Sequence, residues 1–327
     1  MRILVVPDIH LLPKSPAHRT TDYLGKTLSV LDDLIQLIKD QEVQCVIFTG
    51  DIFDRSFKTV NLNYIADIIE KFKSINEICE GYVFSVLGNH EQTYYDSNPF
   101  YCIADISKSE YVKELLKDKY LPSLIAPYIQ VVDRLEFPNL DIHLFHYNKY
   151  TKTYITDLNS NKENIGIYHD DLITFESEQL LYHHRIGKGI SVVNTNIFDN
   201  IKLAILGHIH TPLLPFEINN TTVICSGCLI PRTVAERHTS VSLPLIDVEE
   251  EVTVSLVQFE IQNLSDTIVQ ESVNNAQKKY KANKVFKMVK QIASTQLYDD
   301  MLATLQPSVV KIINDASSPL NIKDYIN

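Results

Sequence analysis

The stretch "AILGHIHTP", residues 204–212, joins a short apolar run to two histidines that stand one residue apart. In an extended chain, the side chains of residues i and i+2 point to the same side. His208 and His210 would therefore project together just beyond a buried strand. Two imidazoles in this position either bind a metal ion or simply begin a loop. The choice depends on which residues follow the other strands of the chain.

Short apolar runs rich in β-branched residues recur along the sequence. They are Ile3–Val6, Val43–Thr49, Tyr82–Leu87, Ile142–Phe145, Ile165–Tyr168, Leu203–Leu206 and Val223–Cys225. Because these runs are continuously apolar rather than alternating, they predict strands that are covered on both faces. Amphipathic patterns of helical spacing lie at Leu28–Ile38 and Ile65–Ile75. This order predicts a layered α/β fold with central β-sheets flanked by helices.

Five of these runs are followed directly by residues of the types that bind metals. The groups are Asp8 and His10; Asp51, Asp54 and Arg55; Asn89, His90 and Glu91; His169; and His208 and His210. Ligands of an open α/β sheet gather at the carboxyl ends of its strands, so we expect these groups to converge in one crevice. Gly50, Gly88 and Gly207 each come immediately before one group. Glycine there permits a tight turn or a close approach of the backbone.

Each group taken alone also has an ordinary structural explanation. Asp8 and His10 could form a turn, Asp51 and Asp54 could cap the next helix, and His169 could be a structural histidine. All five groups share one topological position, however, and this favours a metal site. The donors are carboxylates, imidazoles and one amide oxygen, which suit manganese, iron or zinc.

The number of donors exceeds what one ion needs. We therefore expect two divalent ions that share Asp51 as a bridge. Two such ions act on both the attacking and the leaving oxygen of a phosphoryl displacement. A bridging water, acidified to hydroxide, would be the nucleophile that attacks phosphorus in line.

The series DxH, GDxxD, GNH(D/E), a single His and GHxH resembles the calcineurin-like metallophosphoesterase superfamily, over residues 8–210. The resemblance implies the layered fold of that superfamily and a ligand set for each ion. The ligands of the first ion would be Asp8, His10, Asp51 and His210, and those of the second Asp51, Asn89, His169 and His208.

The same resemblance implies three catalytic residues. His90 matches the histidine that stabilises the transition state or protonates the leaving oxygen, and Asp54 matches the acid that orients this histidine. Such a partner fixes the tautomer of a catalytic imidazole. Arg55 matches the arginine with which the Ser/Thr phosphatases hold phosphate.

Two branches of the superfamily compete. "GDIFDR" and "GNHE" resemble the Ser/Thr phosphatases, but those have glycine where this chain has Leu11, and they lack GHxH. "DIHL", "GDIFD", "LGHIH" and "CSGCLIPRT" are more similar to the SbcD/Mre-type DNA repair exonuclease subunit of phages and bacteria. The chain departs from that branch at Cys228, where Ser or Thr is expected, and at Glu91, where Asp is more usual.

The resemblance implies a two-metal phosphodiesterase, a DNA exonuclease or endonuclease subunit that works with an SbcC-like coiled-coil ATPase in repair and recombination. Mn²⁺ is the expected metal, with Fe²⁺, Zn²⁺ and Mg²⁺ as alternatives. The alternative function is a metal-dependent phosphatase of Ser/Thr or small-molecule type, and a third is an inactive scaffold of the same fold. A homodimer is left open.

Composition limits the class of protein. A chain of 327 residues can form one large domain or two, and its formal charge of −11 argues against coating nucleic acid through bulk charge. Neither a signal peptide nor a membrane span is evident. Five scattered cysteines fit a reduced cytoplasmic protein, in the host cytoplasm if a phage encodes it. Cys225 and Cys228 are expected to be buried structural thiols.

The sequence changes in character near residue 240. We assign residues 1–250 to the catalytic domain and residues 251–327 to a small accessory region, a strand followed by helices. Within this region, Lys278–Lys290 carries six lysines with Tyr280 and Phe286 among them. This segment is either a solvated helix face or a contact for DNA or a partner protein.

Overall fold

A computed structural model describes residues 1–12, 14–16, 18–54, 62–93, 125–147, 158, 161–170, 172–175, 190–192, 195–232, 236, 238–261, 264 and 267–269. Residues Met1–Ile268 form one compact unit. The helices predicted in the accessory region, including Lys278–Lys290, lie outside the described residues, as does Arg55.

The first sheet has five strands in the order β13-β12-β1-β2-β3. Strands β1 (Arg2–Val6), β2 (Cys45–Phe48) and β3 (Val83–Ser85) are parallel. Strand β12 (Ser240–Val248) pairs antiparallel with β1, and β13 (Val252–Glu260) pairs antiparallel with β12. The late strands thus make the N-terminal strand β1 the centre of the sheet.

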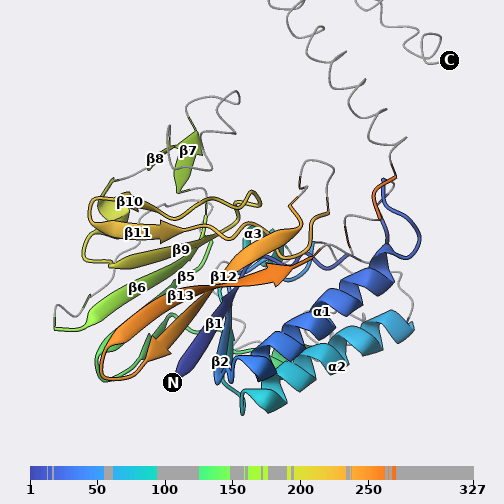
Figure 1. Cartoon of the computed structure of the whole chain (residues 1–327), viewed down its shortest axis with the longest axis horizontal. Helices are drawn as coiled ribbons and strands as arrows, with labels where there is room; N and C mark the ends of the chain where they lie inside the picture. The colour runs from blue at the N-terminus through green and yellow to red at the C-terminus, as the bar shows by residue number, and fades with distance from the viewer. Residues whose placement is uncertain are drawn as a thin grey trace, which may run out of the picture. The chain divides into compact units, whose positions relative to one another are not determined.

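Two long helices pack on one face of the first sheet, as Figure 1 shows. Helix α1 (Tyr23–Asp40) connects β1 to β2, and α2 (Leu62–Ile78) connects β2 to β3. Both contain the amphipathic patterns that predicted them. The core on this face includes Leu4, Val6 and Phe48 from the sheet, Leu31, Leu34 and Ile38 from α1, and Ile68, Phe72 and Ile75 from α2.

The second sheet has six strands in the order β10-β11-β9-β6-β5-β4. Its parallel strands are β5 (Leu140–Phe145), β6 (Glu163–His169), β9 (Leu203–Gly207) and β11 (Thr221–Ile224). The antiparallel edges are β4 (Arg134–Glu136) and β10 (Phe216–Ile218). Among the residues that the structure describes, the remaining short elements are β7 (Ile173–Phe175), β8 (Ile190–Val192), α3 (Asn89–Thr93), η1 (Ala126–Tyr128) and η3 (Thr195–Phe198).

The continuous apolarity of the strands follows from burial of both sheet faces. In β1, Ile3 and Val5 face the second sheet, whereas Leu4 and Val6 face the helices. A third core cluster, which includes Tyr168 and Phe198, covers the other face of the second sheet. The predicted layered α/β fold with central β-sheets is confirmed, and the sheets are two in number among the layers described above.

The hairpin of β12 and β13 contains the predicted boundary at residue 250. Strand β13, which opens the predicted accessory region, pairs with β12 from Val252 to Glu260 and belongs to the first sheet. No helix among the described residues is long and apolar enough to cross a membrane.

Candidate metal centre

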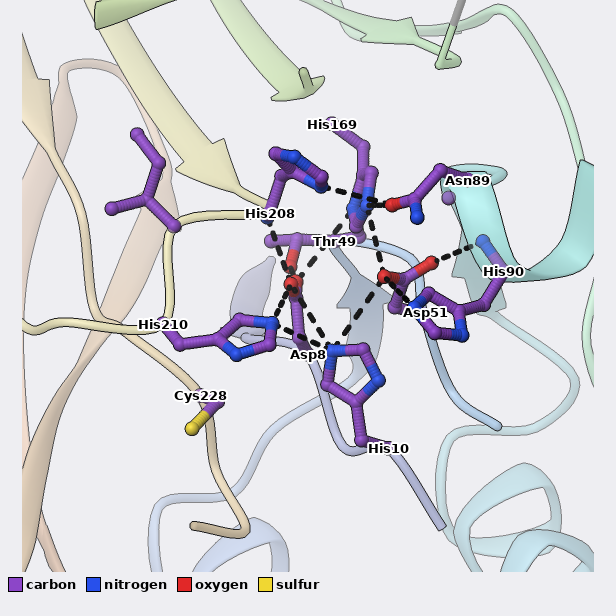
Figure 2. A network of polar contacts seen from close by, with 12 residues as sticks. Asp8, His10, Thr49, Asp51, Asn89, His90, His169, His208, His210 and Cys228 are labelled. Atoms are coloured by element: carbon purple, nitrogen blue, oxygen red, sulfur yellow. Dashed lines mark hydrogen bonds and ion pairs between the residues drawn. The ribbon is translucent and has the colours of Figure 1, made fainter. Parts of the chain in front are cut away.

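The residues that follow the parallel strands of both sheets lie together at one site, which Figure 2 shows from close by. The residues brought together there are Asp8 and His10 after β1, Asp51 after β2, Asn89 and His90 in α3, His169 at the end of β6, and His208 and His210 after β9. All the predicted metal donors therefore converge.

The backbone turns sharply at several of these donors. His10, Asp51 and His208 have φ angles of 53°, 47° and 70°, in the left-handed region. A non-glycine residue held there costs about 1–3 kcal/mol and persists only where its surroundings over-determine it. Such strain clusters at functional sites because it aims side chains that regular structure would direct elsewhere.

Two of the predicted glycines allow the backbone to approach the donors closely. A Cβ on Gly88 would lie 2.1 Å from Asp51 Oδ1, and one on Gly207 would lie 2.8 Å from Asp8 Oδ1. No side chain fits at either position without displacing a carboxylate. The expected close approach is confirmed.

The first donor group consists of Asp8, His10 and His210. Its donor atoms all lie within 4.8 Å of one another. The Nε2 atoms of His10 and His210 are 2.8 Å apart, and each is 3.9 Å from Asp8 Oδ2. Two imidazole nitrogens at this distance can share one proton or bind a common cation.

The second donor group consists of Asp51, His169 and His208, with Asn89 beside them. Asn89 Oδ1 lies 2.9 Å from His208 Nδ1 and 3.1 Å from His169 Nε2. Asp51 Oδ2 is 3.3 Å from His169 Nε2 and 3.5 Å from His10 Nε2, so this carboxylate lies between the two groups. In Figure 2, His208 and His210 accordingly face different groups.

The electrostatics of the cluster favour a cation. Asp8 and Asp51 are fully or almost fully buried. Burial alone would lower the pKa of His169, but the carboxylates of Asp51 and Asp8 raise it to about 10. Burial lowers the pKa of His10 well below its usual value, which leaves its imidazole neutral with a lone pair available. Buried carboxylate oxygens and imidazole nitrogens grouped in this way fit divalent metal ions.

His90 lies at the edge of the donors with its side chain 26% exposed. Its Nδ1 donates a hydrogen bond to the main-chain carbonyl oxygen of Asp54 at 2.6 Å, while the Asp54 carboxylate is 3.7 Å from the same nitrogen. Asp54 thus contacts His90 as expected, but chiefly through its backbone. The carboxylate itself pairs with Arg232. Burial lowers the pKa of His90.

A family model for calcineurin-like phosphoesterases matches residues 1–212. The chain belongs to this family. Among curated proteins, this phosphoesterase is similar to the SbcD subunit of the SbcCD nuclease of Staphylococcus epidermidis, with 20% identity over 253 residues. The aligned part covers 71% of this chain and 65% of that protein, so the chain spans less than two thirds of the length of its relative.

Solved structures of similar fold accompany this match. One is an archaeal phosphodiesterase that is 16% identical in sequence. The match covers 79% of this chain and 100% of that chain, at a TM-score of 0.32. Another is a dimetal phosphatase from Danio rerio that is 11% identical in sequence. The match covers 80% of this chain and 99% of that chain, at a TM-score of 0.40. TM-scores this low support no inference about function.

Thr49 supports donors of the phosphoesterase centre from both its side chain and its backbone. Its hydroxyl donates to Asp8 Oδ1 at 2.7 Å, and its carbonyl oxygen accepts from His169 Nδ1 at 2.7 Å. The second contact leaves His169 Nε2 to face the donors. Sequence reasoning missed Thr49, although it stands at the end of an apolar run directly before "GD".

Glu91 has a structural part in the phosphoesterase centre. Its buried carboxylate accepts hydrogen bonds of 2.9 Å from the N–H groups of Gly88, Asp51 and Ile52. These contacts join the turn after β2 to the turn after β3. Burial, together with the nearby charge of Asp51, raises the pKa of Glu91 to about 7. The Glu of "GNHE" thus holds the backbone that carries the donors.

Cys228 belongs to a further group with His210 and Glu236. Burial raises the pKa of its thiol well above the usual value, which favours the neutral thiol in the metal-free protein. Cys225 and Cys228 are both buried and free, as expected of structural thiols. Glu236 contacts His210, a role that no sequence pattern indicated.

Proposed function

We propose that this calcineurin-like phosphoesterase is a two-metal phosphodiesterase that cleaves DNA. The observation that carries the proposal is the division of the donors into two groups with Asp51 between them. Two-metal sites of this kind serve phosphoryl displacement. The choice of DNA over other phosphoesters is supported by the similarity to a nuclease subunit.

The residues would divide between the ions as the family resemblance implies. Asp8, His10, Asp51 and His210 would hold one ion, and Asp51, Asn89, His169 and His208 the other. Mn²⁺ suits these carboxylate, imidazole and amide donors, with Fe²⁺, Zn²⁺ and Mg²⁺ as alternatives. When bound, the ions would polarise the phosphoryl group and acidify a water molecule.

His90 would act on the leaving group. Donation from its Nδ1 to the carbonyl oxygen of Asp54 fixes the ring, so that Nε2 is the nitrogen that faces the donors, 3.8 Å from Asp51 Oδ2. With the ring proton on Nδ1, Nε2 carries a lone pair; it would accept the proton that the acidified water releases, and the imidazolium so formed would deliver that proton to the departing ribose oxygen. Its partial exposure allows a substrate to reach it.

The proposed assembly is a cytoplasmic nuclease subunit with an SbcC-like coiled-coil ATPase partner, in repair or recombination. The similarity to the SbcD subunit of the SbcCD nuclease supports this partner. We assign the contact with DNA or the partner to the lysine-rich segment Lys278–Lys290 and the phosphate-holding role to Arg55. The formal charge of −11 makes DNA binding depend on the metal centre and on such local basic residues.

The test compares three substrates of the purified chain with Mn²⁺: single-stranded DNA, bis(p-nitrophenyl) phosphate and p-nitrophenyl phosphate. We expect cleavage of DNA and of the diester. Turnover of the monoester without cleavage of DNA would identify a phosphatase instead, and neither bound Mn²⁺ nor hydrolysis would identify an inactive scaffold.

A matched pair of variants ties the activity to the centre. Asn89→Ala removes an amide oxygen that lies among the donors. Asn139→Ala removes a half-buried asparagine, remote from the donors in sequence, whose amide donates to the carbonyl oxygens of Glu249 and Glu250. Only Asn89→Ala should lose DNA cleavage.

A further inference from the structure

We propose that Glu236 is a positioning residue for His210 and that Arg232 links it to Asp54. The three side chains would together hold the imidazoles around the first ion. The inference rests on the proposed metal centre. It assigns a role to Glu236, which lies outside every sequence motif, and a role to Arg232 that the quoted "CSGCLIPRT" did not itself indicate.

The contact between Glu236 and His210 determines which imidazole nitrogen faces the centre. His210 Nδ1 donates to Glu236 Oε1 at 2.8 Å, and Nε2 points to His10 Nε2. With the proton of the neutral ring held on Nδ1, the lone pair of Nε2 is free for a metal ion. A carboxylate on the outer nitrogen of a metal-binding histidine also makes the histidine a stronger ligand.

Glu236 is itself held in place by Arg232. The second carboxylate oxygen, Oε2, accepts from the backbone N–H of Arg232 at 2.7 Å. The guanidinium Nε of Arg232 lies 4.0 Å from Oε1. Both carboxylate oxygens are therefore engaged, and the side chain of Glu236 is only 9% exposed.

Arg232 extends the contacts to the other side of the centre. Its guanidinium pairs with the buried carboxylate of Asp54. Asp54 Oδ1 lies 3.6 Å from His10 Nδ1 and 3.7 Å from His90 Nδ1. The linked side chains of Glu236, Arg232 and Asp54 thus lie next to the outer nitrogens of three imidazoles, which belong to three separate segments: His210, His10 and His90.

In the second donor group, the backbone performs the same task for His169. The outer nitrogen of His169 donates to the carbonyl oxygen of Thr49. A substitution of Glu236 should therefore lower the affinity for the first ion and leave the affinity for the second ion unchanged. If Glu236 merely stabilised the loop, its substitution would lower the stability of the metal-free protein and would lower the affinity for both ions to the same extent.

The experiment measures Mn²⁺ binding by calorimetry and thermal unfolding of the metal-free protein. The variants are Glu236→Ala, Glu236→Gln and the matched control Glu250→Ala, an exposed residue in the turn between β12 and β13. Loss of an outer partner typically weakens metal binding by about 10–100-fold. We expect this loss for one ion in Glu236→Ala, with the affinity for the other ion unchanged.

Glu236→Gln should lose less affinity, because its amide oxygen still accepts from His210 Nδ1. This isosteric variant also supplies the result if Glu236→Ala does not fold. Wild-type affinity for both ions in these variants would overturn the inference. An equal loss of affinity for both ions, together with a lower unfolding temperature of the metal-free protein, would also overturn it. Failure of the wild-type chain to bind Mn²⁺ would instead overturn the proposed function.

Discussion

The Nε2 atoms of His10 and His210 lie 2.8 Å apart, although 200 positions separate the two residues in the chain. His10 follows β1 of the first sheet, and His210 follows β9 of the second. At this distance two neutral rings can share only one proton, so a cation that replaces this proton satisfies both lone pairs. Their approach is the clearest sign that the fold prepares a metal site.

Substitution of each histidine of "GHIH" should remove a different one of the two ions. His208 lies in the group of Asp51 and His169, and His210 lies in the group of Asp8 and His10. We expect His208→Ala to retain the first ion and His210→Ala to retain the second. Metal content after dialysis against dilute Mn²⁺ measures this, and retention of both ions by His208→Ala would contradict the division.

A methyl group at Gly88 should damage the centre, because its Cβ would lie 2.1 Å from Asp51 Oδ1. Asp51 lies between the two donor groups, so we expect Gly88→Ala to weaken the binding of both ions. Gly25→Ala is the control: nothing lies within 4 Å of its added Cβ in helix α1. That variant should gain about 0.5–1 kcal/mol of stability. Normal Mn²⁺ binding by Gly88→Ala would refute the argument.

Glu91→Gln should destabilise the metal-free protein. The amide can replace only one of the two carboxylate oxygens that accept from Gly88, Asp51 and Ile52. A buried N–H left without an acceptor costs about 1–3 kcal/mol. Urea unfolding in the presence of a chelator measures the loss, with the exposed Glu217→Gln in β10 as the control. Equal unfolding midpoints for the two variants would count against this role.

Asp141 should make the stability of the second sheet depend on pH. Burial alone would raise the pKa of this carboxyl group, but Lys162 at 3.0 Å and Arg134 at 2.6 Å lower it overall. A lowered folded-state pKa contributes stability that is present above the unfolded value of about 3.9 and is lost as pH falls through the folded value.

Asp141→Asn should therefore lose about 1–3 kcal/mol of unfolding free energy at neutral pH. Its difference from the wild type should shrink as the pH falls below about 4. Denaturant unfolding across this range measures the effect, with Asp67→Asn, exposed on α2, as the control. A difference that did not change with pH would show that the ion pairs do not stabilise the fold.

The individual elements and the donors could be predicted from the sequence because both depend on local patterns. The apolar run Ile3–Val6 contains four of the residues of β1, and the residues placed after five such runs do meet. Burial on both faces leaves this pattern in the sequence whatever the neighbouring strand is.

Features that depend on distant partners could not be predicted. The pairing of β12 with β1 joins residues 245 positions apart, as in the register of Arg2 with Asp247. Glu236 belongs to no motif and the role of Arg232 was not indicated by "CSGCLIPRT", because both roles arise only when the loop before β12 meets His210 and Asp54. Thr49 acts on His169 through its carbonyl oxygen, which every residue type carries.

Each donor group draws on both sheets. Asp8 and His10 come from the first sheet and His210 from the second, whereas Asp51 comes from the first and His169 and His208 from the second. Bound ions would thus cross-link two layers that pack on each other chiefly through apolar side chains, much as a disulfide joins two segments. An ion at 100 times its dissociation constant adds about 2.7 kcal/mol to the folded state. Mn²⁺ should therefore raise the unfolding temperature of the whole catalytic unit, and removal of the metal should loosen one sheet from the other before either sheet comes apart.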